Sequence, residues 1–249
     1  MTRTQSSPLV GSLASSAVAG GVAWTAVEYG LHRFAMHELR GKGLASKEHL
    51  SHHADVTYFT PTSKKLLSAA STGSVVLPLT WATIGKRRAI AFTAGMLTAY
   101  AGYEVAHRRT HTHPPKNTFG RWMRKSHFHH HFGSPMRNFG VTSPVWDAVL
   151  GTYDRPGIIT LPRRMAPHWM LDDDGEVKTE YQSDYRAKGR LATDPKERAR
   201  DRVDAFTNVA PLLEDVDRND VGHNVEAAER PETKDRTAPG SLRTVAAET

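Results

Sequence analysis

Three apolar stretches are separated by polar ones in the first part of the chain. Residues 4–27 and 66–85 contain no charged side chain. As helices rising 1.5 Å per residue, both are long enough to cross a hydrocarbon core about 30 Å thick. Residues 89–103 are shorter, so a helix there must continue through Glu104 and His107 to leave a membrane. The pattern predicts an all-α, membrane-embedded helical bundle with about three membrane helices.

The second and third apolar stretches are expected to form a helical hairpin. Only the basic residues 86–88 separate them, and Pro78 inside the second stretch is the expected site of a kink. Both ends of this hairpin then face the side on which the polar segments lie. Two alternatives stay open: a water-soluble bundle that buries these helices, and a signal peptide cleaved after Ala19 in place of the first membrane helix.

Five histidines lie on two consecutive predicted helices. The first includes residues 104–113 and ends at Pro114, and the second begins at Asn117 or Thr118 and ends at Gly133. Residues three and four positions apart share one face of a helix, so the histidines of each set point to one side. They are His107 and His111 on the first helix, and His127, His130 and His131 on the second.

Residues 32–65 contain two further histidine clusters, with the patterns His-x4-His and His-x2-His-His. The complete set of ten clustered histidines is His32, His37, His49, His52, His53, His107, His111, His127, His130 and His131. Neutral imidazole is the commonest side-chain metal ligand, and the absence of cysteine excludes a thiolate zinc site. Ten imidazoles exceed what one ion can hold, so the sequence predicts two metal ions with about five ligands each.

Three other residues near these clusters are given different roles. His129 lies on the opposite side of its helix from the neighbouring clustered histidines and is not expected to bind metal. Glu104 shares the helical stripe of His107 and is expected to support the ligands without binding directly. Asp147, in the apolar segment 138–156, is a candidate acceptor for an imidazole N–H, or alternatively a helix cap or surface carboxylate.

Charge is divided unevenly along the chain, although the mean hydropathy of -0.50 is typical of a soluble protein. Residues 1–171 hold 20 Lys and Arg against 7 acids, a net +13, whereas residues 172–249 hold 13 against 19, a net -6. Such a basic region attracts anionic membranes or nucleic acid, and nothing resembles a groove-reading helix, a zinc finger or a stacking platform. Most basic residues flank the histidines, which places the histidine clusters on the cytoplasmic side.

The rest of the chain is polar and charged from Asp172 onward. A short helix is predicted around residues 195–206, and residues 214–249 are expected to be disordered because they contain little that could form a core. The predicted organisation is a membrane-embedded catalytic domain of residues 1–160, a cytosolic extension of residues 161–213, and the tail.

The four clusters in order, followed by NFGVTSPVWD and GTY, resemble the fatty acid hydroxylase superfamily of membrane lipid hydroxylases and sterol desaturases. The resemblance covers roughly residues 24–154. It implies that the ten histidines bind a dinuclear iron centre at the cytosolic face of the membrane, where zinc can substitute in isolated protein. It also implies an oxidoreductase that uses dioxygen as co-substrate to insert oxygen into an aliphatic C–H bond of a membrane lipid or fatty acyl chain.

Some enzymes of this family carry a fused cytochrome b5 domain, but no haem-binding HPGG stretch occurs in this sequence. The resemblance therefore implies a separate electron-donor protein, of ferredoxin or cytochrome b5 type with a reductase. A sterol desaturase or a carotenoid hydroxylase is the alternative within the same family.

Two readings from other classes compete with the lipid hydroxylase. A non-redox membrane protein that binds or transports metal would need polar ligands near the bilayer midplane, whereas these clusters lie at or beyond helix ends. A protein that binds nucleic acid or anionic lipid through its basic region would require the histidines to be incidental. The sequence favours the lipid hydroxylase.

Overall fold

The structure is a computed structural model that describes residues 8–192 and 194–211. The described residues belong to one compact unit. The disordered tail expected for residues 214–249 lies outside the described residues, and the domain boundary expected at residue 160 stays a prediction.

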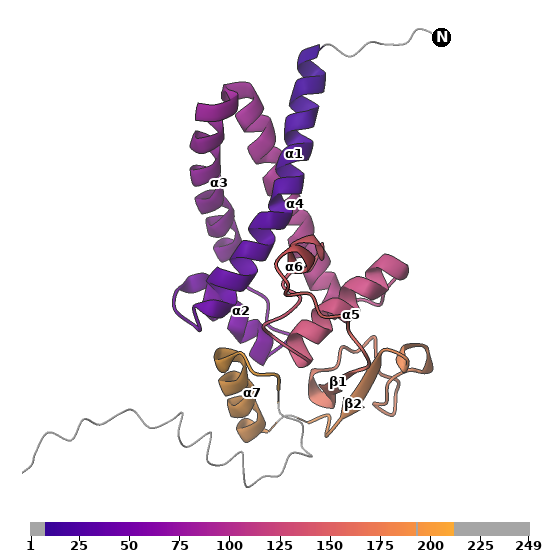
Figure 1. Cartoon of the computed structure of the whole chain (residues 1–249). Coiled ribbons are helices and arrows are strands. Elements are labelled where there is room, and N and C mark those ends of the chain that lie inside the picture. The colour runs from indigo at the N-terminus through magenta and orange to yellow at the C-terminus, as the bar shows by residue number, and fades with distance from the viewer. Residues whose placement is uncertain (1–7, 193, 212–249) are drawn as a thin grey trace, which may run out of the picture. The chain divides into compact units, whose positions relative to one another are not determined.

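Three long helices lie along one another: α1 (Pro8–Gly30), α3 (Thr62–Ile84) and α4 (Lys86–Thr112), as Figure 1 shows. The chain turns between α3 and α4 at Gly85, whose φ of 80° favours glycine. The basic residues 86–88 form the first turn of α4 and not the connection itself. The expected mostly helical fold is confirmed, and two of the three helices, α1 with its continuation and α3, are candidate membrane spans.

Helices α1 and α4 approach each other closely at two glycines. A Cβ atom added to Gly20 would lie 1.9 Å from the backbone oxygen of Phe92, and one added to Gly95 would lie 1.9 Å from that of Ala17. Only glycine permits this distance, and small residues of this kind let helices pack closely in a membrane. The crossing fixes the position of α1 relative to α4.

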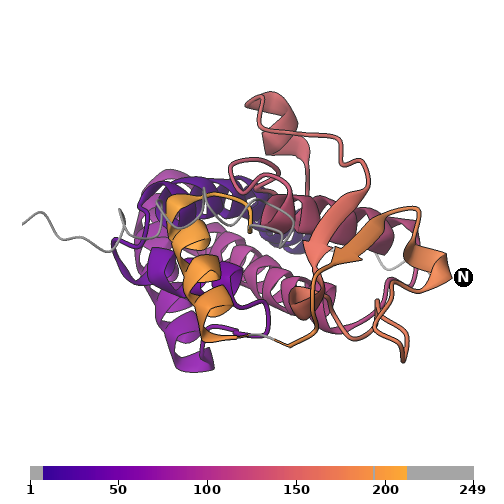
Figure 2. The same ribbon diagram turned by 90° about the horizontal axis from the view of Figure 1, so that it is seen from below.

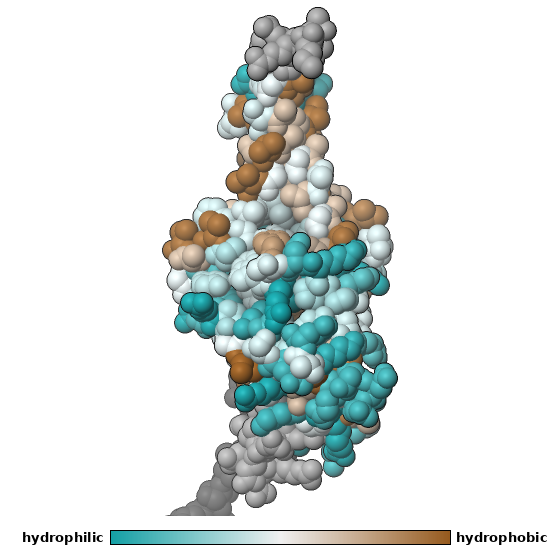
Figure 3. Space-filling model, turned by 90° about the vertical axis from the view of Figure 1, so that its right-hand side faces the viewer, coloured by the Kyte–Doolittle hydropathy of each residue, from teal (hydrophilic) through white to brown (hydrophobic). Residues whose placement is uncertain are grey.

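The surface of α3 is that of a membrane helix. None of its residues is buried, and Leu66, Val75 and Leu79 are exposed by 64%, 58% and 65%. Among the described residues, Leu9–Glu38 and Thr62–Ile84 are long and apolar enough to cross a membrane. Hydrophobic residues gather on the part formed by the long helices and hydrophilic ones on the opposite part (Figure 3). The protein is therefore membrane-associated, and the water-soluble alternative fails because these helices are not buried.

Shorter elements follow at one end of the long helices. A π-helix, η1 (Leu31–Glu38), continues α1 without interruption, and after it come α2 (Leu44–Ala54), α5 (Thr118–Phe132) and α6 (Val145–Val149). Asn117 caps α5 by accepting a hydrogen bond from the backbone N–H of Gly120, and α4 ends just before Pro114, as the sequence predicts.

The segment after α6 contains a small sheet that the sequence analysis does not anticipate. Strands β1 (Ile159–Pro162) and β2 (Tyr185–Lys188) pair in parallel, with the short 3-10 helices η2 (Arg163–Met165) and η3 (Thr179–Tyr181) between them. Strands of four residues are too short to show a clear alternation of apolar and polar positions. The sheet packs on α5 through Phe128, Leu161 and Tyr185, which are almost completely buried.

The last described helix, α7 (Pro195–Thr207), confirms the predicted C-terminal helix. Asp194 and Glu197 form a capping box at its start. Its Asp201 accepts a hydrogen bond of 2.6 Å from Arg164, and both side chains are buried, with 3% and 4% exposed. Helix α7 packs against α2, as the view from below shows (Figure 2).

Candidate metal centre

The structure brings the ten predicted ligands together as two groups of five. Within each group, one ring nitrogen per histidine lies within 4.8 Å of all the others, and every residue is buried. Group A consists of His32, His37, His49, His53 and His130. Group B consists of His52, His107, His111, His127 and His131. The groups adjoin, because the rings of His53 and His131 stack with centroids 4.0 Å apart.

Helices α2 and α5 each contribute to both groups, in opposite ways. On α2, His49 and His53 are four residues apart, share one face and belong to group A, while His52 belongs to group B. On α5 the pair four residues apart, His127 and His131, belongs to group B, while the intervening His130 belongs to group A. At about 100° per residue, a residue three positions further along a helix lies about 60° to one side of the first residue. One His-x2-His-His cluster can therefore serve two neighbouring centres.

The π-helix accounts for the first cluster. His32 and His37 are five residues apart, which on an α-helix would separate them by about 140°. Hydrogen bonding from i to i+5 in η1 adds an extra residue per turn and brings both onto one side. Both are buried in group A. Sequence analysis found the pair but not the π-helix, for which the five-residue spacing is the available signal.

Adjacent ring nitrogens within each group are almost in contact. In group A, the Nε2 atom of His37 lies 2.9 Å from that of His49 and 3.0 Å from that of His130. In group B, the Nε2 atom of His111 lies 2.9 Å from that of His127 and 3.1 Å from that of His52. A ring nitrogen carries either one hydrogen or one lone pair. Hydrogen bonds among these atoms therefore cannot satisfy all of them.

A shared cation does satisfy them. Two nitrogens bound at right angles to one ion, each about 2.1 Å from it, are about 3 Å apart. The observed Nε2 spacings have this value, and the buried Nε2 atom of His107 has no hydrogen-bond partner. Both groups therefore fit a metal ion, with five nitrogen donors for each.

Outer hydrogen bonds direct four of the rings. Each Nδ1 atom faces an oxygen that can only accept: the backbone oxygens of Phe139, Tyr58 and Arg137, and the side-chain oxygen of Asn208. The pairs are His32 with Phe139, His52 with Tyr58 at 2.7 Å, His130 with Arg137 at 2.7 Å and His37 with Asn208 at 2.9 Å. We assign the hydrogen to Nδ1 in these rings, which leaves the Nε2 lone pair directed at the centre.

Burial keeps these imidazoles neutral. Desolvation lowers the pKa of His52 to about 4, and it holds the pKa of His53 and His131 well below the usual value, as neighbouring histidines do to a lesser degree. A neutral imidazole has a lone pair free for a cation. At neutral pH the groups are therefore in the form that binds metal.

His129 and Glu104 were both expected not to bind metal directly. His129 belongs to neither group, and its Nε2 atom lies 3.6 Å from a carboxylate oxygen of Asp154. Glu104 is also outside both groups and forms an ion pair with Lys65.

Asp147 was a candidate imidazole acceptor, or alternatively a helix cap or surface carboxylate, and it takes none of these positions: its side chain is buried and Pro144 is the N-cap of α6. Asp147 accepts hydrogen bonds from the backbone N–H groups of Phe139 and Gly140, at 2.9 and 2.7 Å, and from the hydroxyl of Thr152, at 2.7 Å. Its carboxylate is occupied in holding this loop, and Phe139 in turn accepts the hydrogen bond of His32. Asp147 is therefore linked to His32 through this loop, by way of Phe139.

Glu28 is a second buried carboxylate that holds this loop, and it is not among the site residues that the sequence predicts. It accepts the backbone N–H groups of Val141 and Thr142 at 2.7 and 2.9 Å. A carboxylate at the end of an otherwise apolar helix was its only signal in the sequence.

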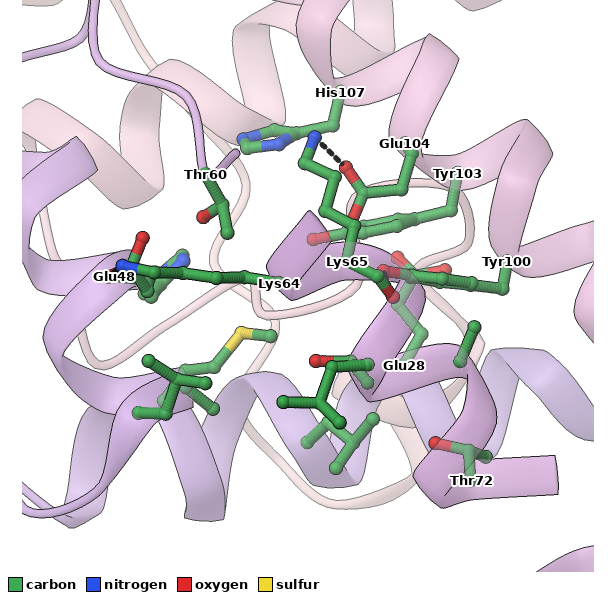
Figure 4. A pocket seen from close by; sticks show the side chains of 18 of the residues that line it. Glu28, Glu48, Thr60, Lys64, Lys65, Thr72, Tyr100, Tyr103, Glu104 and His107 are labelled. Atoms are coloured by element: carbon green, nitrogen blue, oxygen red, sulfur yellow. Dashed lines mark hydrogen bonds and ion pairs between the residues drawn. The ribbon is translucent and has the colours of Figure 1, made fainter. Parts of the chain in front are cut away.

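A cavity of about 370 Å³ leads to the histidines from between the long helices. Leu31 of η1, Leu67 of α3 and Leu97 of α4 line its apolar part, and His52 and His107 line its polar end. Ion pairs of Lys64 with Glu48 and of Lys65 with Glu104 also line it; Figure 4 shows the second pair beside His107. The cavity thus joins an apolar wall between the long helices to the candidate metal centre.

Comparison with known proteins identifies the class. The sequence profile of the fatty acid hydroxylase family matches residues 17–152, more than half of the chain. The chain belongs to the fatty acid hydroxylase family.

Two characterised relatives and one solved structure are similar over this region. The dihydroceramide fatty acyl 2-hydroxylase FAH2 of Arabidopsis thaliana is 29% identical over 143 residues, 56% of this chain and 60% of its own length. The ceramide very long chain fatty acid hydroxylase SCS7 of Saccharomyces cerevisiae is 35% identical over 152 residues, 55% of this chain and 37% of its own length. The solved structure of full-length scs7p, in which only the hydroxylase domain is visible, is 30% identical with a TM-score of 0.49 and covers 57% of this chain and 56% of its own.

The chain thus spans less than two thirds of the length of these relatives. The names of these relatives describe ceramide and fatty acyl hydroxylation.

We expect the purified protein to contain two metal ions per chain, because each group supplies five buried nitrogen donors. Elemental analysis of protein prepared with supplied iron measures this stoichiometry. One equivalent or none, in a preparation with full activity, would contradict the dinuclear centre.

Proposed function

We propose that this protein is an oxygen-dependent lipid hydroxylase that inserts one oxygen atom into an aliphatic C–H bond of a membrane lipid or fatty acyl chain, with the ten histidines holding two iron ions. The observation that carries the proposal is the pair of adjoining five-histidine groups at the end of an apolar cavity between membrane helices. The sterol desaturase and carotenoid hydroxylase alternatives differ in product and are separated by the experiment below.

The residues suit first-row transition metals such as iron, for which imidazole is a good ligand. Iron supplies the activation of dioxygen that breaking an unactivated C–H bond requires, since acid–base side chains cannot do this. Five imidazoles per ion, all neutral and buried, bind the ions without a bridging thiolate. The outer oxygen acceptors hold four of the rings in one tautomer and one orientation. The chain thereby provides a rigid, water-poor site.

The cavity supports an amphipathic substrate. Its apolar wall is made by helices α1, α3 and α4, so an acyl chain can enter from the bilayer and remain in contact with apolar side chains. The ion pairs of Glu48 and Glu104 lie beside the same cavity and offer polar partners to the part of a lipid near the headgroup. The names of the relatives, which describe ceramide and fatty acyl hydroxylation, agree with this substrate class.

Electrons have to reach the metal centre from outside the described chain. We propose a separate donor of ferredoxin or cytochrome b5 type with its reductase. The histidines lie at the end of the membrane helices that is flanked by most of the basic residues, so we propose that this end faces the cytoplasm. A negatively charged donor surface would be attracted to it.

Lipid mass spectrometry tests the proposal. Cells that express the protein are compared with cells that carry the empty vector and with cells that express the double variant His53→Ala/His131→Ala, which removes one ligand from each group. We expect a lipid or fatty acid that gains the mass of one oxygen atom only in cells with the unaltered protein. Fragmentation of the product locates the carbon attacked.

The other outcomes overturn the proposal in distinct ways. A product that has lost two hydrogen atoms identifies a desaturase. An oxygenated sterol or carotenoid, with acyl chains unchanged, identifies another branch of the family. Unchanged lipids from cells that also supply an electron donor, with metal present in the purified protein, indicate a metal-binding protein without redox activity.

A further inference from the structure

The C-terminal segment returns to the metal centre at a single side chain, Asn208. This residue follows α7 and lies beyond residues 17–152, to which the family profile matches. Its side-chain oxygen lies 2.9 Å from Nδ1 of His37, and its side-chain nitrogen donates to the backbone oxygen of the same histidine at 3.1 Å. Asn208 therefore contacts both the ring and the backbone of one candidate ligand.

The second contact fixes the orientation of the amide. A backbone oxygen can only accept, so the atom facing it must be the NH2 group of Asn208, and the atom facing Nδ1 must be its oxygen. An amide oxygen cannot donate, so the hydrogen of the His37 ring resides on Nδ1. The Nε2 atom then presents its lone pair to group A.

His37 occupies a central position in group A. Its ring is completely buried, with 0% exposed, and its Nε2 atom lies about equally close to those of His49 and His130. Among the described residues, Asn208 supplies the hydrogen-bond acceptor for this Nδ1 atom, and without it the ring could adopt the other tautomer. That tautomer places a hydrogen on Nε2 and removes the lone pair that a metal ion needs.

Helix α7 holds the amide in place. The buried ion pair of Asp201 with Arg164 attaches the helix, and its capping box fixes its first turn. Asn208 itself is the C-cap, with φ 61° and ψ 36°, a left-handed conformation that asparagine and glycine tolerate better than other residues. The side chain is thus presented by a folded element that packs on α2 (Figure 2).

We propose that Asn208 is a positioning residue that fixes the tautomer and orientation of His37, so that group A can bind its metal ion fully only when α7 is docked. The proposal rests on the metal centre of the proposed function and is independent of which lipid is hydroxylated. It makes the C-terminal extension a working part of the site, although the family profile ends at residue 152.

The test uses the full chain, purified in the metal-loaded form, with three variants. Asn208→Gly removes the amide but keeps a residue suited to the left-handed cap. Asn208→Asp keeps an oxygen acceptor for Nδ1, in the arrangement of carboxylate, histidine and metal found in many metal sites. Thr207→Ala, at an exposed neighbour whose hydroxyl bonds only within α7, is the matched control.

Metal content and the rate of metal release to a chelator are measured for each protein. We expect Asn208→Gly to release one of its two ions about 10- to 100-fold faster than the unaltered protein, the usual effect of losing such a hydrogen bond. Asn208→Asp should restore release to within a few-fold of the unaltered protein, and Thr207→Ala should match it. Rescue by aspartate separates the positioning role from a merely structural one.

Three results would overturn the inference. Asn208→Gly could retain both ions with unaltered release, Asn208→Asp could fail as Asn208→Gly does, or the unaltered protein could bind fewer than two ions. Metal retention with this pattern but no lipid product would leave the inference intact and overturn the proposed function, so the two failures are distinguishable.

Discussion

Replacing His130 with alanine is expected to remove metal from group A and to lower product formation by more than about 100-fold, since loss of a ligand exceeds the effect of losing a supporting hydrogen bond. The Nε2 atom of His130 lies 3.0 Å from that of His37 and 3.1 Å from that of His53, so it joins two other ligands. Elemental analysis of the purified variant and lipid mass spectrometry of cells that express it measure the two effects.

The neighbouring residue provides the control. His129 points away from both groups, with its Nε2 atom near Asp154. His129→Ala is therefore expected to retain both metal ions and to lose at most a small part of the activity. Loss of metal in His129→Ala together with retention in His130→Ala would show that the helical assignment of the whole cluster is wrong.

Replacing Gly95 with alanine is expected to disrupt the crossing of α1 and α4. The added Cβ atom would lie 1.9 Å from the backbone oxygen of Ala17, and a backbone oxygen cannot move unless the helices separate. Overpacking of this kind costs about 1–3 kcal/mol or more. Because α1 leads into His32 and His37 while α4 carries His107 and His111, we expect a lower thermal unfolding temperature and a lower metal content.

Gly102→Ala is the matched change on the same helix, because a Cβ atom there would have nothing within 4 Å. This variant is expected to be as stable as the unaltered protein or slightly more stable, since alanine is the better helix former. Thermal unfolding in detergent and elemental analysis compare the two variants. Equal behaviour would mean that the helices can separate at this crossing without cost.

The sequence contains enough to predict most helices and the full set of clustered histidines. Pro114 ends one helix and Asn117 begins the next, and both effects are local properties of the chain. The ten histidines could be found because histidine is uncommon and their spacing is regular. The structure brings together the residues that this spacing selected.

The division into two groups could not be predicted, because it depends on how helices from distant parts of the chain pack. Sequence spacing shows that His49, His52 and His53 lie near one side of α2, but not that His52 faces His111. The contact of Asn208 with His37 also depends on such packing, whereas the four-residue strands were missed because they are too short to show a clear alternation of apolar and polar positions. Asp147 was a candidate acceptor for an imidazole N–H, with a helix cap or surface carboxylate as the alternative, but it binds backbone N–H groups of its own loop.

The opposite contributions of α2 and α5 to the two groups have a consequence for biogenesis. During synthesis, a chain that has been extended only as far as α4 holds four ligands of group A and three of group B, so neither set is complete. Helix α5 then supplies the missing members of both at once: His130 to the first set, and His127 and His131 to the second. Both proposed ions can therefore have all five histidine ligands only after α5 has been synthesised, and a nascent chain that stops short of α5 leaves both groups incomplete.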